Sequence, residues 1–224
     1  MSGEAIRWSA AEWRHGVDRR RRADLAELSA AGSADAPTVI KVGGSLLERD
    51  DLPVCLGPVL EVAGEFAVLV AGGGVLADGV RDVDRNMRLG DELAHWLAIA
   101  AMKASGRRLA ASLGLPCVED LAMVRERRGD RRPLVLDCER MMRRDMGSAR
   151  PLPANWDTTS DSIAALAASE LGASECWLLK SCPPPAESLT ECAEAGYVDP
   201  VLPALVDRGR TLAVLWPETA EIRR

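Results

Sequence analysis

The sequence predicts an α/β protein, a three-layer α/β/α sandwich built on an open, mainly parallel sheet. Short apolar runs rich in β-branched residues alternate along the chain with longer segments of helical periodicity. Two of these runs stop at glycine, which is typical of buried strands. Strands and helices that alternate in this way form a parallel sheet with helices on both faces. The chain has 224 residues, 47% of them hydrophobic, enough for one such core.

The first half supplies an N-terminal extension and two predicted strands. Residues 1–36 are rich in Ala, Arg and Ser, and Ser9–Glu12 resembles a capping box, so we expect this extension to be helical or partly disordered. The predicted domain covers residues 37–224. Its first strands are Thr38–Gly43 and Phe66–Ala71, both followed by glycine, and helices are predicted at 52–63, 75–86 and 89–113.

The second half has a less regular pattern at its start. Residues 116–150 contain one convincing strand, Leu134–Asp137, and the arginines from Arg125 to Arg132 favour a solvated loop. Regularity returns after them, with a helix predicted at 160–171, a strand at Cys176–Lys180, a Pro-rich loop at 183–185, a helix around Leu205–Val206 and a last strand at Thr211–Trp216.

Composition excludes several classes of function. A net charge of −6 argues against nucleic-acid binding, and no apolar run approaches the ~18 residues of a membrane helix. The N-terminus lacks the apolar stretch of a secretory signal, so we expect a cytoplasmic protein. The six cysteines show no Cys-x-x-Cys spacing, which predicts reduced, mostly buried thiols and no metal site.

The predicted strand ends carry residues suited to an anion. The chain has 28 cationic residues but only three lysines, and two of these, Lys41 and Lys180, end predicted strands. Glycines follow the strands at Gly43-Gly44-Ser45 and at Gly72-Gly73-Gly74, where the backbone N–H groups can approach a phosphate. If these strands are neighbours, two ammonium groups and two glycine loops meet in one crevice, which predicts a phosphoryl-transfer site.

A pair of carboxylates, Asp157 and Asp161, lies at the start of the predicted helix 160–171. One interpretation is a capping box formed by Thr158 and Asp161, a common feature of helix starts. The other is functional, because Asp161 is suited to hold both lysine ammonium groups in place without accepting a proton. Both interpretations stay open at this point.

An alternative site must be weighed against this one. Gly72-x-Gly74-x-x-Ala77 after a strand satisfies the dinucleotide-binding fingerprint of a Rossmann oxidoreductase, with Asp91 or Glu92 near the distance of a ribose-binding acid. That fingerprint belongs on the first strand, whereas here an earlier strand already ends in Lys-x-Gly-Gly-Ser. No Walker motif occurs, and His15 and His95 are expected to be structural or exposed.

Four motifs in order resemble the amino acid kinase family. They are Val39-Ile-Lys-Val-Gly-Gly-Ser-Leu46, Ala71-Gly-Gly-Gly74 with Ala77-Asp78 and Val80-Arg81, Thr159-Ser-Asp-Ser-Ile-Ala-Ala165, and Leu178-Leu-Lys-Ser181. The resemblance covers about residues 37–217. Among small members, the chain looks most similar to the [5-(aminomethyl)furan-3-yl]methyl phosphate kinases of methanofuran and methylofuran biosynthesis. It departs from relatives after Lys180, where Ser181-Cys-Pro-Pro-Pro185 replaces an Asp-Gly-containing stretch.

The resemblance implies a role for each residue of the site. Lys41 would contact the transferred phosphoryl group, Lys180 would stabilise the leaving side, and Asp161 would orient both lysines. The nucleotide would bind at Gly43, Gly44, Ser45, Asp157 and Ser181, and the acceptor at Gly72, Gly73, Gly74 and Arg81.

The function expected from this resemblance is an ATP-dependent kinase with Mg²⁺ carried on the nucleotide. Its acceptor would be a small phosphate or carboxylate, above all an (aminomethyl)furanmethyl phosphate converted to the diphosphate. The protein is expected to form a homo-oligomer, with no nucleic-acid or membrane partner. The alternatives are a catalytically silent nucleotide-binding, oxyanion-binding or storage protein on the same fold and the Rossmann oxidoreductase.

Overall fold

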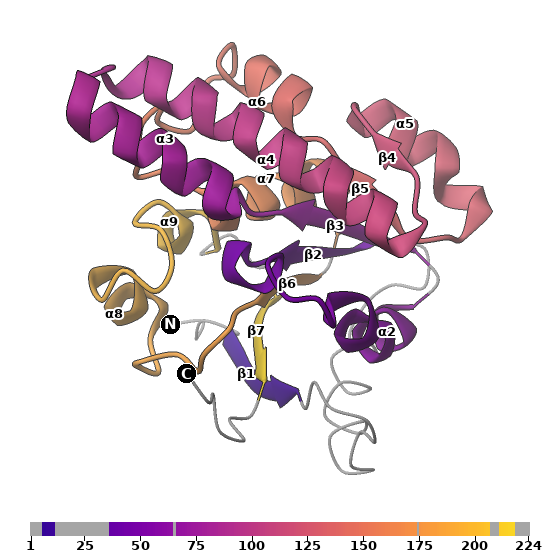
Figure 1. Cartoon of the computed structure of the whole chain (residues 1–224). Helices are drawn as coiled ribbons and strands as arrows, with labels where there is room; N and C mark the ends of the chain where they lie inside the picture. The colour runs from indigo at the N-terminus through magenta and orange to yellow at the C-terminus, as the bar shows by residue number, and fades with distance from the viewer. Residues whose placement is uncertain (1–5, 12–35, 65, 174, 207–210, 218–224) are drawn as a thin grey trace.

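The computed structural model describes residues 6–11, 36–64, 66–173, 175–206 and 211–217, and these form a seven-stranded sheet with flanking helices (Figure 1). The strands are β1 (Ile6–Ala11), β2 (Thr38–Val42), β3 (Ala67–Ala71), β4 (Cys117–Val118), β5 (Leu134–Leu136), β6 (Glu175–Leu179) and β7 (Thr211–Pro217). Their order across the sheet is β1-β7-β6-β2-β3-β5-β4, and each paired neighbour is parallel. The predicted α/β fold with a parallel sheet is confirmed.

Helices connect these strands and cover the sheet. They are the 3-10 helices η1 (Gly44–Leu46) and η2 (Arg127–Asp130), and the α-helices α2 (Leu52–Ala63), α3 (Gly74–Met87), α4 (Asp91–Leu113), α5 (Leu121–Glu126), α6 (Glu139–Asp145), α7 (Ser160–Leu171), α8 (Leu189–Glu194) and α9 (Leu202–Val206). Figure 1 shows α3 and α4 side by side, in agreement with the contacts between these two helices.

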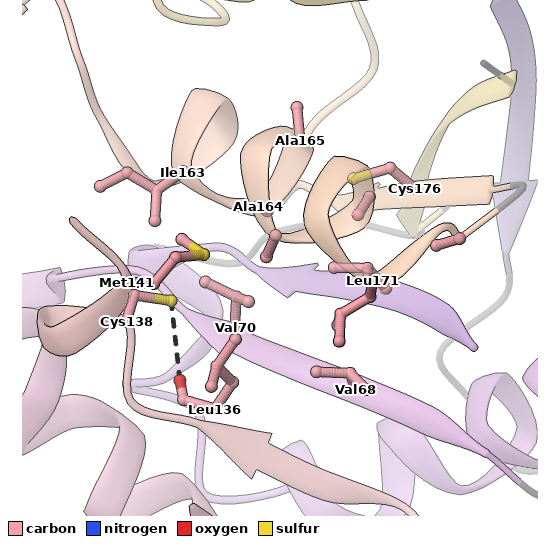
Figure 2. Packing of buried hydrophobic residues seen from close by; sticks show 14 of the residues in the cluster. Val68, Val70, Leu136, Cys138, Met141, Ile163, Ala164, Ala165, Leu171 and Cys176 are labelled. Carbon is pink, nitrogen blue, oxygen red and sulfur yellow. Dashed lines mark hydrogen bonds between the residues drawn. The ribbon is translucent and has the colours of Figure 1, made fainter. Parts of the chain in front are cut away.

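Two apolar clusters, one on each face of the sheet, form the core. Side chains alternate between the faces of a strand, so Val39 of β2 packs against the α7 side while Ile40 packs against the α2 side. Figure 2 shows the first cluster, in which Ile163 and Ala164 of α7 lie over Val70 of β3. This alternation also decides which way the polar residues at the strand ends point.

The register places the ends of β2, β3 and β6 at one edge of the sheet. Lys41 lies opposite Leu178 of β6 and Val70 of β3, so the loops that follow these strands are direct neighbours. The three strand ends singled out from the sequence therefore meet at the carboxyl edge of the sheet, where parallel sheets bind their ligands.

Two features differ from the sequence expectation. Residues Ile6–Ala11 were expected to be helical or disordered, but they form β1, which pairs in parallel with β7 at the edge of the sheet. Residues 12–35 lie outside the described residues. Within 116–150, expected to be irregular apart from one strand, the chain also forms β4, α5, η2 and α6.

The strand order separates this fold from a Rossmann domain. Counted from β2 in chain order, the sheet follows 6-5-1-2-4-3, whereas a Rossmann sheet follows 3-2-1-4-5-6. The glycines of the dinucleotide fingerprint follow the second of these strands rather than the first. The order therefore counts against the oxidoreductase alternative.

The cysteines and the apolar helices agree with the composition. All six cysteines are free thiols, and Cys55, Cys138, Cys176 and Cys192 are buried, whereas Cys182 is exposed. Burial raises the pKa of the Cys138 thiol, which keeps it neutral inside the core. Across the described part of the chain, every helix is too short or too polar to cross a bilayer.

Candidate active site

Strand alternation directs both strand-end lysines to the same face. Lys41 lies two residues after Val39 in β2, and Lys180 lies two residues after Leu178 of β6. Val39 and Leu178 both belong to the core cluster beneath α7. Because side chains two residues apart share a face, both ammonium groups reach toward the first turn of α7.

Asp161, in that first turn, binds both lysines. Lys41 Nζ lies 2.9 Å from Asp161 Oδ1, and Lys180 Nζ donates to Asp161 Oδ2 at 2.6 Å. The Asp161 side chain is 4% exposed and that of Lys41 6% exposed, so the pairs are shielded from water. Burial opposes ionisation of the carboxyl, but the charges of Lys41 and Lys180 outweigh it and lower the pKa of Asp161.

Lys180 is held by two further groups from the segment before α9. Its Nζ donates to the Tyr197 carbonyl oxygen at 2.6 Å and lies 5.0 Å from the centre of the Tyr197 ring. Burial and the nearby charge of Lys41 lower the pKa of Lys180, partly offset by Asp161. The ammonium group is therefore fixed in position and less basic than an exposed lysine.

The start of α7 is clamped by Asp199 rather than by a capping box. The helix is capped at Thr159 without a side-chain hydrogen bond, so the capping box of Thr158 and Asp161 is wrong. Instead Asp199 Oδ2 accepts from the backbone N–H of Thr159 at 3.0 Å and of Ser162 at 2.9 Å. It also binds both of these side chains through their hydroxyls.

Asp199 therefore supplies the cap from 37 residues away in sequence. Its carboxylate also accepts from Leu202 N at 2.9 Å, which joins the start of α9 to that of α7. Burial raises the pKa of Asp199, opposed by the hydrogen bonds from Ser162. The clamp fixes the turn of helix that presents Asp161 to the lysines.

The two glycine loops touch one another. A Cβ atom on Gly44 would lie 2.7 Å from Gly74 N, and one on Gly72 would lie 2.8 Å from Gly44 N. Gly74 has φ +55°, in the left-handed region that favours glycine. Backbone packing of this closeness requires glycine, so these residues serve the approach of the β2 and β3 loops to each other.

In the two glycine loops, some backbone N–H groups are already hydrogen-bonded and others are free. Gly43 N–H donates to Leu179 O at 3.0 Å and Gly72 N–H to Val42 O at 2.9 Å, so neither is available to a phosphate. This corrects the expectation that Gly43 donates to the nucleotide. By contrast Gly44 and Ser45 begin η1 and Gly74 begins α3, positions whose N–H groups have no acceptor within their helix.

A cavity of about 450 Å³ opens over these loops. The residues of the sequence-predicted site that line it are Lys41, Gly44, Ser45, Gly72, Gly73, Gly74, Arg81, Asp161 and Lys180. Ser181 lies beside it, because the Ser45 and Ser181 hydroxyls are 3.1 Å apart. Gly43 and Asp157 are not among the lining residues, and the exposed Asp157 carboxylate instead accepts from Asn155 Nδ2 at 3.2 Å.

A second wall of the cavity comes from α3, α4 and the turn before α7. Arg81 pairs with Asp78 at 2.7 Å and lies 4.8 Å above the Trp156 ring. His95, expected to be structural or exposed, is 3% exposed and lines the cavity. Burial lowers the pKa of His95, partly offset by its contact with the Asn155 carbonyl.

Besides His95, residues of this site that sequence reasoning missed include Trp156, Thr158, Tyr197 and Asp199. Tyr197 and Asp199 follow β6 by about 20 residues in a segment with no motif, so no local signal marks them. Thr158 and Trp156 stood next to a quoted motif, and their polarity at the start of an apolar helix was the available signal.

Comparison with known proteins supports the fold. The sequence matches no family model and no curated protein. The uridylate kinase from Archaeoglobus fulgidus superposes with a TM-score of 0.57 at 17% identity, over 82% of this chain and 91% of that one. The UMP kinase from Ureaplasma parvum gives 0.56 at 14% identity, over 82% and 90%. The one from Bacillus anthracis gives 0.52 at 11% identity, over 81% and 87%. At these identities the likeness establishes a shared fold.

Proposed function

We propose that this protein is an ATP-dependent kinase that transfers the γ-phosphoryl group to a small anionic acceptor. One observation carries the proposal. Two buried ammonium groups share a single carboxylate at the edge of a cavity. Residues with free backbone N–H groups line the same cavity. The triad of Lys41, Lys180 and Asp161 therefore has one positive charge in excess, which favours a polyanion. The three solved structures compared above are named uridylate or UMP kinases, which agrees with this activity.

Each residue of the triad has a separate task in this proposal. Lys41 contacts the transferred phosphoryl group and Lys180 the leaving phosphate oxygens, while Asp161 keeps the two ammonium groups apart and oriented. Gly44, Ser45 and Ser181 bind the nucleotide phosphates, and Asp157, next in sequence to the lining residues Trp156 and Thr158, supports the site. The donors of this site suit phosphate oxygens rather than a metal ion, so we propose that Mg²⁺ is carried by the nucleotide phosphates, where it neutralises their charge.

The chemical step needs no base from the protein. An acceptor phosphate or carboxylate oxygen is already ionised at neutral pH, and it forms the new bond to the γ-phosphorus as the bond to the β-γ bridging oxygen breaks. ADP departs with the electron pair of that bond. Lys180 stabilises the charge that develops on the leaving oxygen, and Lys41 the charge on the transferred group. The protein therefore acts through position and charge.

We propose that the acceptor binds between Gly72–Gly74 and Arg81, beneath the wall formed by α3 and α4. On the sequence resemblance, our specific candidate is an (aminomethyl)furanmethyl phosphate, converted to the diphosphate for methylofuran or methanofuran synthesis. The cavity of about 450 Å³ admits a compact acceptor of this kind beside nucleotide phosphates.

ADP release by the purified protein tests the proposal directly. The panel of acceptors contains phosphomonoesters, among them the furan phosphate, and carboxylates, each with ATP and Mg²⁺. ADP formation that depends on the acceptor is the expected result. Absence of turnover with every member would overturn the kinase and favour the second candidate.

The second candidate is a catalytically silent nucleotide-binding, oxyanion-binding or storage protein on the same fold. The observation that favours it is the loop Ser181–Pro185 after Lys180, which replaces the Asp-Gly stretch of relatives. Calorimetry with ATP separates the cases, because this candidate binds nucleotide without turnover. A Rossmann oxidoreductase would instead bind a nicotinamide nucleotide in the same experiment.

Self-association and a cytoplasmic location stay predictions of this proposal. Large apolar side chains are exposed along α3 and α4, at Val75, Leu76, Val83, Met87, Leu93 and Leu97. Exposed apolar surface of this extent often marks an interface. Sedimentation of the purified protein at several concentrations measures whether it is a homo-oligomer.

A further inference from the structure

We infer that His95 and Thr158 together recognise a hydrogen-bond donor, an amine or a hydroxyl, on the acceptor. The inference rests on the proposed function, in that it takes the cavity to hold an acceptor. It assigns chemistry to the wall formed by α4 and the turn before α7, which is separate from the lysines and glycine loops that handle phosphate.

The turn from Asn155 to Thr158 is fixed in place by contacts to two helices. Trp156 Nε1 donates to Asp84 Oδ2 of α3 at 2.8 Å, and Arg81 lies over the same indole ring. His95 Nδ1 of α4 lies 3.3 Å from the Asn155 carbonyl oxygen. Because that oxygen also accepts from Thr158 N at 3.3 Å, His95 and Thr158 share one anchor and lie next to each other.

This anchor sets the tautomer of His95. A carbonyl oxygen only accepts, so Nδ1 must carry the proton that joins the ring to Asn155. Burial lowers the pKa of His95 and keeps the ring neutral at pH 7, which leaves Nε2 unprotonated. Among the described residues no hydrogen bond to Nε2 is found, and the ring lines the cavity. Nε2 is therefore an acceptor in the cavity wall that is open to a donor from a ligand.

Thr158 adds a second unsatisfied atom to the same wall. Its residue is 5% exposed, and its Oγ1 has no hydrogen-bond partner within the part of the chain that the structure describes. Buried hydroxyls are nearly always paired, so an unpaired one in a cavity wall indicates a polar ligand group. The hydroxyl both donates and accepts, so it can bind the same amine or hydroxyl as His95 Nε2.

The surroundings limit the size and polarity of this group. Ile99 and Met102 of α4 and Ile163 of α7 line the cavity beside the pair and are buried. A single donor on a compact apolar scaffold satisfies the pair while the scaffold packs against these side chains. An acceptor that lacks the donor leaves the buried Thr158 hydroxyl unpaired and displaces water from His95 Nε2 without replacing its hydrogen bond, which is how such sites reject analogues.

Matched acceptors test the inference by calorimetry in the absence of nucleotide. The probes are alkyl phosphates and the ω-amino- and ω-hydroxyalkyl phosphates of equal chain length. The wild-type protein should bind at least one donor-bearing member roughly tenfold or more tightly than its alkyl counterpart. Equal affinities within every pair, or no affinity for any donor-bearing member, would overturn the inference.

Three variants separate recognition from folding. Thr158→Val keeps the shape of the side chain, and His95→Asn keeps an N–H group for the Asn155 carbonyl while it removes Nε2. Both should lose the preference within a pair and keep the affinity for the alkyl member, whereas equal weakening of both members would contradict the inference. Thr190→Val, on the exposed side of α8, is the matched control and should keep the full preference.

The outcome is separable from that of the proposed function. Binding measurements alone test the discrimination between acceptors, whereas ADP formation tests the proposed kinase activity. If the wild-type protein discriminates between acceptors but forms no ADP with any of them, the proposed kinase activity is wrong, and the inferred recognition of a hydrogen-bond donor is supported. If it forms ADP with all members of each pair at equal KM, the kinase stands and this inference is overturned.

Discussion

Two clusters of lysine and carboxylate lie at the carboxyl edge of this sheet, with different balances of charge. In the first, Lys41 and Lys180 share the single carboxylate of Asp161. In the second, Lys103 of α4 lies 3.2 Å from Asp137 after β5 and 3.0 Å from Glu139 of α6, and Arg143 binds the same Glu139 at 2.8 Å. The first cluster has a surplus cation, whereas in the second the charges of Lys103 and Arg143 balance those of the two carboxylates.

This difference explains why one cluster is a candidate active site and the other a structural joint. Hydrogen bonds to Glu139 and Asp137 raise the pKa of Lys103, whereas burial beside Lys41 lowers that of Lys180. Lys103 is not among the residues that line the cavity, and its charge is fully used between α4 and the β5–α6 segment. A spare charge facing a cavity, rather than a lysine at a strand end, distinguishes the site.

Asp161→Asn should have the largest effect. It leaves two buried ammonium groups without a counter-ion, a change that costs roughly 3–5 kcal/mol of unfolding free energy in buried pairs. Because the pKa of Asp161 is lowered in the fold, its stabilisation is full above the ordinary aspartate pKa and is lost as pH falls through the lowered value.

Urea unfolding of wild type and Asp161→Asn at several pH values measures this contribution. The difference in unfolding free energy should be large at neutral pH and should shrink in acid. A difference that does not change with pH would show that the carboxylate charge is not what holds the triad.

Lys41→Met and Lys180→Met should each lower kcat/KM by roughly 100- to 1,000-fold, the usual loss when one fixed charge donor leaves a reacting centre. Either change leaves Asp161 paired with the remaining lysine, so the fold should persist. Steady-state ADP release measures the rate, and circular dichroism checks the fold. Wild-type rates in both variants would refute the proposed mechanism.

The lowered pKa of Lys180 predicts an alkaline limit to activity. The ammonium form is the active one, so kcat/KM for ATP should be full at neutral pH and fall about tenfold per pH unit above that pKa, starting below the ordinary lysine value. Burial raises the pKa of Tyr197, so its phenol does not titrate in this range.

A pH profile of kcat/KM for wild type and Lys180→Arg tests this limit. The arginine variant keeps a charge that does not titrate, so its residual activity should show no decline in the same range. A decline shared by both proteins would assign the titration to another group.

The sequence was sufficient to predict the central strands of the fold and the central residues of the site. Gly43 and Gly72 mark the ends of β2 and β3, and the scarcity of lysine made Lys41 and Lys180 conspicuous. Once these strands are neighbours in a parallel sheet, strand alternation alone brings both lysines to the face of α7.

Parts of the site built by distant segments were not predictable. Asp199 caps α7 across 37 residues, and nothing near it in sequence indicates a helix start to be capped. The donors of Gly43 and Gly72 are used by neighbouring strands, which is a property of register and not of the glycine motif. Strand β1 lies in a segment rich in helix-forming residues, and its pairing with β7 is a tertiary effect that overrides local preference.

Lys103→Met should have the smallest effect on catalysis and completes the comparison. Glu139 keeps its pairing with Arg143, but Asp137, whose side chain is 2% exposed, is left with an unpaired oxygen, so a loss of about 1–3 kcal/mol in unfolding free energy is expected. Because this cluster does not line the cavity, kcat/KM and the KM for ATP should not change. Urea unfolding and steady-state kinetics on the same preparation measure the two quantities. A loss of activity as large as that of Lys41→Met would mean that both lysine clusters act on the phosphates, and that the surplus of cation over anion does not define the site.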